Sequence, residues 1–83
     1  MTYKVEENNN TCIVHLNGEI DMEVADKARQ TILPLIKEGK IIQVNLSKVE
    51  YMDSSGISVL IESKQLAEKN NAKFELTEVS KPV

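Results

Sequence analysis

Short apolar stretches along the chain predict four β-strands. Residues 3–6 alternate weakly, and residues 11–16 are β-branched and mostly apolar, which is typical of strands. The three asparagines at 8–10 lie between them and predict the turn of a hairpin. The largely apolar residues 41–46 predict a buried strand, and the alternating residues 73–77 predict a fourth strand.

A helical repeat of apolar residues follows the second strand. Residues 17–20 are predicted to form a turn, and Asp21 is a good N-cap for the helix after it. Pro34 lies inside the repeat, where a proline costs about 3 kcal/mol, so we expect a kink or a broken last turn. Gly39 is a natural stop. The apolar positions of this repeat are Met22, Ala25, Ala28, Ile32, Leu35 and Ile36.

A second helix is predicted from about residue 55 to residue 70, after a short connection at residues 47–52. Lys64 and Glu68 are expected on its outside, and two asparagines end it. Residues 79–83 form a tail after the fourth strand. The positions expected to face the core are Ile57, Leu60, Ile61 and Ala67.

The order strand, strand, helix, strand, helix, strand predicts an α/β fold with a small mixed four-stranded sheet in a single domain, residues 1–83. Strands joined through a helix pair in parallel by right-handed crossovers, whereas the opening hairpin is antiparallel. The loops after the strands at 11–16 and 41–46 should then share one edge of the sheet. Ligand and partner sites of open α/β sheets commonly lie at that edge.

Composition narrows the range of functions. The chain of 83 residues has a net charge of −3, and its Lys and Arg residues are spread along it, which argues against a nucleic-acid surface. Its three aromatic residues are too few for a platform that stacks single-stranded nucleic acid. No apolar run approaches the roughly 18 residues of a membrane span, and there is no signal-peptide core. The single cysteine, Cys12, cannot form an internal disulfide, so we expect a soluble, cytoplasmic protein without a membrane partner.

The most informative segment is Asp53-Ser54-Ser55-Gly56, at a predicted strand-to-helix turn. Asp, Ser and Gly are favoured around an N-cap, worth about 1 kcal/mol, so capping alone accounts for these residues. A phosphate on a serine here would lie near the positive end of the helix and add about −1.5 to −2 charges to an exposed corner. Such a change could switch the binding of a partner without unfolding the protein. Glu19 and Asp21 form a second acidic corner, which turn and cap chemistry also explains and which is expected at the same edge.

The chain offers no set of residues for catalysis. A serine hydrolase needs Gly-x-Ser-x-Gly, which neither Ser54 nor Ser55 has. The only histidine, His15, is predicted on the strand face opposite to Cys12, and one His with one Cys cannot form an ordinary zinc site. The three glycines are not grouped as in a phosphate-binding loop. We therefore expect no enzymatic activity, no metal and no cofactor, and nucleotide binding at the second helix is a minor alternative that the charge of Asp53 opposes.

These residues resemble the STAS domain, and most closely the bacterial anti-sigma factor antagonists. The resemblance is carried, in order and spacing, by residues 17–21, 44–46 and 51–57 and covers nearly the whole chain. It implies a protein that binds an anti-sigma factor with serine kinase activity and so frees a sigma factor. It also implies that the kinase phosphorylates Ser54, that a metal-dependent serine phosphatase reverses this, and that ATP and Mg²⁺ belong to the kinase. The partner-binding residues are expected to be Glu19, Asp21, Asp53, Ser54, Ser55 and Gly56.

The resemblance also implies a difference at the end of the chain and an alternative role. Family members usually continue past the fourth strand into a further helix, which this chain is expected to lack. Part of one sheet face should then be uncovered, which favours a homodimer or strand exchange. The alternative is a STAS scaffold subunit of a lipid-transport or stress-signalling complex, in which Ser54 is never modified.

Overall fold

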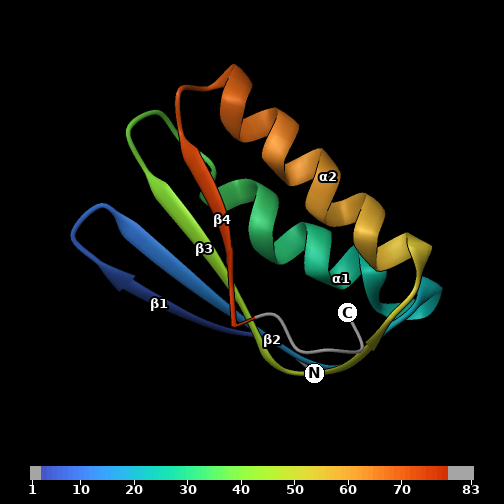
Figure 1. Cartoon of the computed structure of the whole chain (residues 1–83). Helices are drawn as coiled ribbons and strands as arrows, with labels where there is room; N and C mark the ends of the chain where they lie inside the picture. The colour runs from blue at the N-terminus through green and yellow to red at the C-terminus, as the bar shows by residue number, and fades with distance from the viewer. Residues whose placement is uncertain (1–2, 79–83) are drawn as a thin grey trace.

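The computed structural model describes residues 3–78, and its secondary structure follows the predicted order (Figure 1). The predicted tail at 79–83 lies outside the described residues. The elements are β1 (Lys4–Asn8), β2 (Thr11–Ile20), α1 (Met22–Ile32), the 3-10 turn η1 (Leu33–Leu35), β3 (Ile41–Met52), α2 (Ser54–Lys69) and β4 (Lys73–Thr77).

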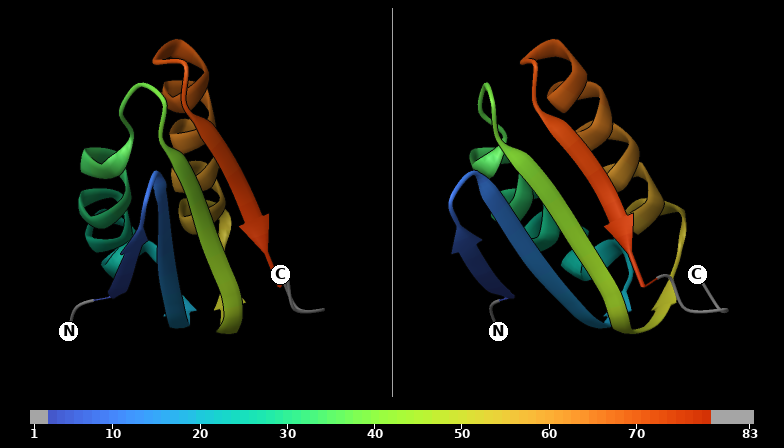
Figure 2. Two further views of the ribbon diagram at one scale, coloured as in Figure 1. Left: turned by 90° about the vertical axis from the view of Figure 1, so that its left-hand side faces the viewer. Right: turned by 60° about the vertical axis from the view of Figure 1, so that its left-hand side comes forward.

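The strands form one mixed sheet in the order β1-β2-β3-β4. β1 and β2 are antiparallel, as the hairpin predicted, and β3 is parallel to both β2 and β4. Both helices cover the same face of this sheet, while the opposite face is left open by residues 3–78 (Figure 2). The predicted α/β fold with a mixed four-stranded sheet is therefore confirmed.

The core lies between this sheet and the two helices and is almost entirely aliphatic. Burial alternates along β2 and β3, so that every second side chain points to the helices. His15 lies on the opposite face of β2, as predicted. Each fully buried Val, Leu or Ile contributes about 1.5–3 kcal/mol to folding. The largest fully buried side chains are Leu16, Ile20, Ile32, Ile42, Leu46, Val14, Val44 and Val59.

The two central strands are longer than the sequence predicted. The prediction of a turn at residues 17–20 is wrong, because they continue β2, and the predicted connection at residues 47–52 continues β3. The β2–β3 pairing has two register irregularities in this part, and Gly18 takes a φ of +72°, which glycine adopts without strain. The Asn-Gly pair therefore marks an irregular stretch inside the ladder and not its end.

Pro34 has the predicted effect on the first helix. α1 ends at Ile32, and the chain tightens into η1, where the proline occupies the first turn, a position that tolerates a residue without an N–H. Gly39, with a φ of +80°, lies in the turn before β3 and not at the helix end. The last turn of the predicted helix is therefore broken, as expected.

Three apolar residues that the helical repeats assigned to the core are exposed. Met22 is 77% exposed, Ile57 45% and Ile61 54%. Met22 is the first residue of α1, whereas Ile57 and Ile61 lie on the side of α2 that faces β4. A helical repeat identifies an apolar face but does not show where the sheet beneath it ends. No helix within residues 3–78 is long and apolar enough to cross a membrane.

Candidate functional site

α1 and α2 both begin at the edge of the sheet where β2 and β3 end (Figure 1). Ile20 and Met52, the last residues of β2 and β3, are partners in the parallel ladder. The backbone N–H of Asp53 donates a hydrogen bond to the carbonyl oxygen of Ile20 at 3.2 Å. The topology therefore brings Asp21 and Asp53 together, as the predicted parallel pairing required.

Each of these aspartates caps its helix. Asp21 accepts hydrogen bonds from two backbone N–H groups in the first turn of α1, at 3.0 and 3.3 Å. Asp53 Oδ1 accepts from the N–H groups of Ser55 at 2.8 Å and Gly56 at 3.3 Å. A cap of this kind contributes about 1 kcal/mol. The cap role predicted from the sequence is confirmed for Asp21, and Asp53 has the same role in α2.

Gly56 allows the first turn of α2 to lie against the end of β2. A Cβ atom at this position would lie 2.5 Å from Cγ of Met52, 2.9 Å from Cγ2 of Ile20 and 3.1 Å from the carbonyl oxygen of Ile20. Glycine is the residue that permits such a close approach of backbone to neighbouring atoms. Gly56 thereby positions the turn that carries Ser54.

The two serines of the turn differ in accessibility. Ser54 is the first residue of α2 and is exposed, and its hydroxyl forms no hydrogen bond with residues 3–78. Ser55 is half-buried, and its backbone N–H is bound to Asp53. Ser54 therefore presents the hydroxyl that another protein can reach more easily.

Glu19 joins this edge from a strand and not from the predicted turn. It is exposed on β2 and is the ladder partner of Tyr51 on β3. Together with Asp21 and Asp53 it gives this edge of the sheet three carboxylates. The structure therefore brings all the predicted site residues to one edge of the sheet.

Exposed apolar side chains belong to the same edge, and the sequence did not predict them as part of the site. Tyr51 is 51% exposed on β3, and Met22 directly follows the cap residue Asp21. Ile57 lies in the first turn of α2, where its N–H donates to the carbonyl oxygen of Asp53 at 3.1 Å. A protein that docks on this edge would remove these apolar groups from water. Their adjacency to the two cap residues was the available signal, but helical spacing assigned Met22 and Ile57 to the core.

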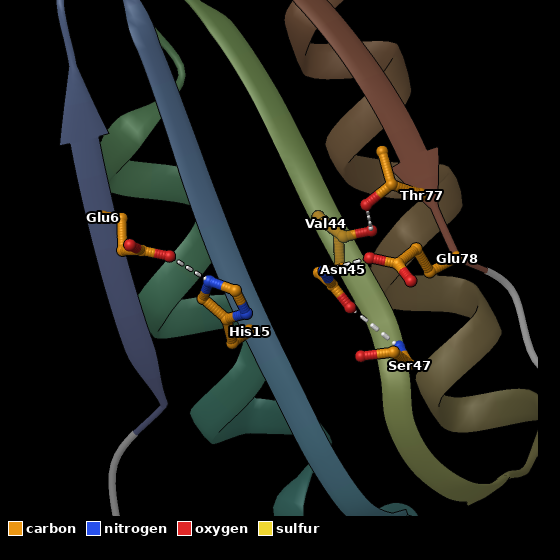
Figure 3. A network of polar contacts seen from close by, with 7 residues as sticks. All are labelled: Glu6, His15, Val44, Asn45, Ser47, Thr77 and Glu78. Carbon is orange, nitrogen blue, oxygen red and sulfur yellow. Dashed lines mark hydrogen bonds and ion pairs between the residues drawn. The ribbon is translucent and has the colours of Figure 1, made fainter.

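Polar groups on the open face of the sheet form a separate network (Figure 3). His15 and Glu6 form a hydrogen bond between β2 and β1, and this bond lowers the pKa of Glu6. Asn45 donates to Glu78 at 3.1 Å and accepts from the N–H of Ser47 at 2.8 Å. His15 is thus engaged on the open face of the sheet, away from the helix N-termini. Among the described residues, no group of three His, Cys, Asp or Glu side chains is placed to hold a metal ion.

Comparisons with known sequences indicate one family. Residues 2–83 match the STAS domain. The anti-sigma-B factor antagonist of Bacillus subtilis (strain 168) is 32% identical over 76 residues, which cover 92% of this chain and 70% of that protein. The anti-sigma-B factor antagonist of Listeria monocytogenes is 35% identical over 58% of this chain and 43% of its own length.

Solved structures show the same similarity. An anti-sigma factor antagonist from Mycobacterium paratuberculosis matches with a TM-score of 0.79 and 28% identity, over 90% of this chain and 64% of that one. The anti-sigma factor antagonist SpoIIAA in its unphosphorylated form matches with a TM-score of 0.79 and 24% identity, over 95% of this chain and 74% of that one. The chain therefore spans about two thirds to three quarters of these two proteins.

Proposed function

The chain belongs to the STAS domain family, and on this premise we propose that it is an anti-sigma factor antagonist switched by phosphorylation at Ser54. The unmodified chain binds an anti-sigma factor that is also a serine kinase, and this binding frees a sigma factor. The kinase phosphorylates Ser54 and then dissociates from the chain, and a serine phosphatase restores the unmodified form. The protein acts in the cytoplasm as a binding regulator and not as an enzyme.

The observation that carries this proposal is the exposed Ser54 at a capped helix N-terminus. The names of the relatives from Bacillus subtilis and Mycobacterium paratuberculosis support the binding role. SpoIIAA, which shares the fold, has been solved in the phosphorylated form as well as the unphosphorylated one. The fold thus accommodates a phosphorylated state in that relative.

In the unmodified state, the apolar groups at this edge supply the contact area. Met22, Tyr51 and Ile57 are all at least 45% exposed, and a partner that covers them removes apolar surface from water. The same partner also covers the Ser54 hydroxyl, which is neutral and can be given a hydrogen-bond acceptor at modest cost. Docking is therefore favourable while Ser54 carries no charge.

Phosphorylation changes the electrostatics of this edge more than the fold. The phosphate adds about −1.5 to −2 charges to a chain whose net charge is already −3. Asp53 already occupies the N–H groups of Ser55 and Gly56, so these donors are engaged and the phosphate remains in solvent. Burying it would leave a strongly hydrated charge next to carboxylates, which is costly. The modified chain should therefore keep its fold and lose its partner.

Phosphorylation of the purified chain with ATP and the anti-sigma factor kinase of its own organism tests this assignment, with the site mapped by mass spectrometry. We expect one phosphate on the wild type and none on Ser54→Ala, which should still bind the kinase. Ser58→Ala, at an exposed serine of the same helix, is the matched control and should be modified like the wild type. Full labelling of Ser54→Ala would refute the assignment.

A further inference from the structure

β3 contains two extra residues, relative to β2, just before it leads into α2. Between the ladder pairs His15–Asn45 and Ile20–Met52, six residues of β3 lie opposite four residues of β2, and the register shifts twice. Each shift is a β-bulge in β3, a feature that is rare in parallel pairs and often lies next to functional sites, where it changes the direction of side chains. The first of the two bulges directly follows Asn45.

The bulges set both the burial of β3 and the place where it ends. Up to Leu46 every second residue is buried, whereas the next two buried residues, Val49 and Met52, each follow after three positions. Strict alternation would instead turn Val49 to the open face of the sheet. Removal of one bulge would also move Met52 by one residue, about 3.3 Å, along β2. The bulges therefore keep Met52 opposite Ile20, where α2 begins beside the end of β2.

Asn45 holds the first bulge with its side chain (Figure 3). Its Oδ1 atom accepts a hydrogen bond from the backbone N–H of Ser47, two residues further on, at 2.8 Å. This local bond gives the bulged backbone an acceptor within its own strand. The Nδ2 group of Asn45 donates to Glu78 at 3.1 Å, which fixes the orientation of the amide. Both polar atoms of the Asn45 side chain are therefore engaged, and one of them stabilises the bulge.

We propose that Asn45 is a positioning residue for the partner-binding edge. The inference rests on the proposed function, because Tyr51 and the Ser54 turn, which follow the bulge, are the groups proposed to meet the anti-sigma factor. The backbone N–H of Asp53 reaches the carbonyl oxygen of Ile20 because β3 arrives there in its bulged register. By ordering this register before a partner binds, Asn45 reduces the conformational entropy that is lost on docking.

Loss of the Asn45 side chain should loosen this edge without unfolding the chain. Val49 and Met52 are 3% and 6% exposed, and their burial still favours the bulged register. The N–H of Ser47, however, loses its side-chain acceptor, so that residues 47–53 sample more conformations. Binding then has to order this segment, and the affinity for the partner falls.

Isothermal titration calorimetry with the anti-sigma factor kinase of the chain's own organism tests the proposal. We expect Asn45→Ala to raise the dissociation constant about fivefold, which corresponds to the net effect of one hydrogen bond. Asn45→Asp keeps an acceptor for Ser47 and should bind like the wild type, because the exposed Glu78 side chain can turn to solvent. Gln43→Ala is the matched control, since it removes another amide of the open face, which donates to Glu75 at 3.1 Å, and it should leave the dissociation constant unchanged.

Amide hydrogen exchange measured by NMR adds a readout that needs no partner. The N–H of Ser47 should exchange about fivefold faster in Asn45→Ala than in the wild type. Asn45→Asp and Gln43→Ala should keep the wild-type rate at this amide. Circular dichroism checks that each variant is folded.

The two readouts separate failure of this inference from failure of the proposed function. Equal affinity of the wild type and Asn45→Ala for the kinase would refute the positioning role and leave the proposed function standing. Equal weakening by Asn45→Ala and Gln43→Ala would reduce Asn45 to a general structural role. Unchanged exchange at Ser47 in Asn45→Ala would show that the bulge does not depend on this side chain. A wild-type chain that does not bind the kinase would refute the proposed function and, with it, the role of Asn45 in docking.

Discussion

Replacing Gly56 with alanine tests whether the start of α2 is held against the end of β2. Helix propensity alone favours alanine over glycine by up to about 1 kcal/mol, so a first turn without close neighbours would become more stable. The added Cβ, however, would lie 2.5 Å from Cγ of Met52 and 2.9 Å from Cγ2 of Ile20. The two effects have opposite signs, which makes the outcome decisive.

The magnitude depends on which neighbour can move. The Met52 side chain is flexible, but Ile20 is only 1% exposed and its carbonyl oxygen accepts the N–H of Asp53. Overpacking of a buried site costs about 1–3 kcal/mol. The contact with the buried Ile20 and its carbonyl oxygen puts the cost in the upper part of this range, at about 2–3 kcal/mol. After subtraction of a propensity gain of about 1 kcal/mol, we expect Gly56→Ala to lower the free energy of unfolding by about 1–2 kcal/mol. The Tm should fall by roughly 5–15 °C, since 1 kcal/mol corresponds to about 4–8 °C in a domain of this size.

Urea unfolding followed by far-UV circular dichroism measures this effect. The midpoint should fall while the slope with urea stays constant, because the surface exposed on unfolding is unchanged. Ser58→Ala is the matched control, because at this exposed position of α2 the substitution changes helix propensity alone. The free energy of unfolding of this variant should rise by a few tenths of a kcal/mol. A Gly56→Ala variant as stable as Ser58→Ala would refute the close approach.

Three further predictions concern individual polar groups. Asp53→Ala should lower the free energy of unfolding by about 1 kcal/mol in thermal melts, whereas Asp53→Asn, which still caps, should be close to wild type. The hydrogen bond to His15 lowers the pKa of Glu6 in the folded chain. Ionised Glu6 therefore stabilises the fold above the unfolded pKa of about 4.3, and this contribution is lost as pH falls through the folded pKa. In Glu6→Gln, the free energy of unfolding measured in urea should depend less on pH between about pH 5 and pH 3, and an unchanged pH dependence would contradict this. Burial and the nearby Glu7 raise the pKa of the Cys12 thiol, so iodoacetamide should alkylate the native chain far more slowly than the urea-unfolded chain, and equal rates would contradict it.

The elements themselves could be predicted because their signals are local. Residues 73–77 alternate, and β4 has those bounds. Pro34 breaks the first helix because of its own covalent structure, whatever lies around it. The ends of β2 and β3 could not be predicted, since residues 17–20 contain turn-forming residues and remain in the sheet only because β3 pairs with them. Pairing between distant segments overrides local preference there.

The candidate site, too, could be predicted from the sequence only where it depends on local chemistry. The caps at Asp21 and Asp53 follow from short-range chemistry and were visible in the sequence. The role of Gly56 depends on contacts with Ile20, which comes from a distant part of the chain. The exposure of Met22 depends on where the helix layer ends, and no helical repeat contains that information.

A comparative pull-down is the sharpest test of the proposal that Ser54 switches the binding of a protein partner. The wild-type chain, Ser54→Asp and the control Ser58→Asp serve as baits in native lysate of the chain's own organism, and captured proteins are identified by mass spectrometry. We expect the wild type and Ser58→Asp to capture a kinase-like anti-sigma factor and Ser54→Asp to lose it. Retention of the same transporter or scaffold partners by all three baits would contradict the switch and leave Ser54 as an ordinary first residue of α2.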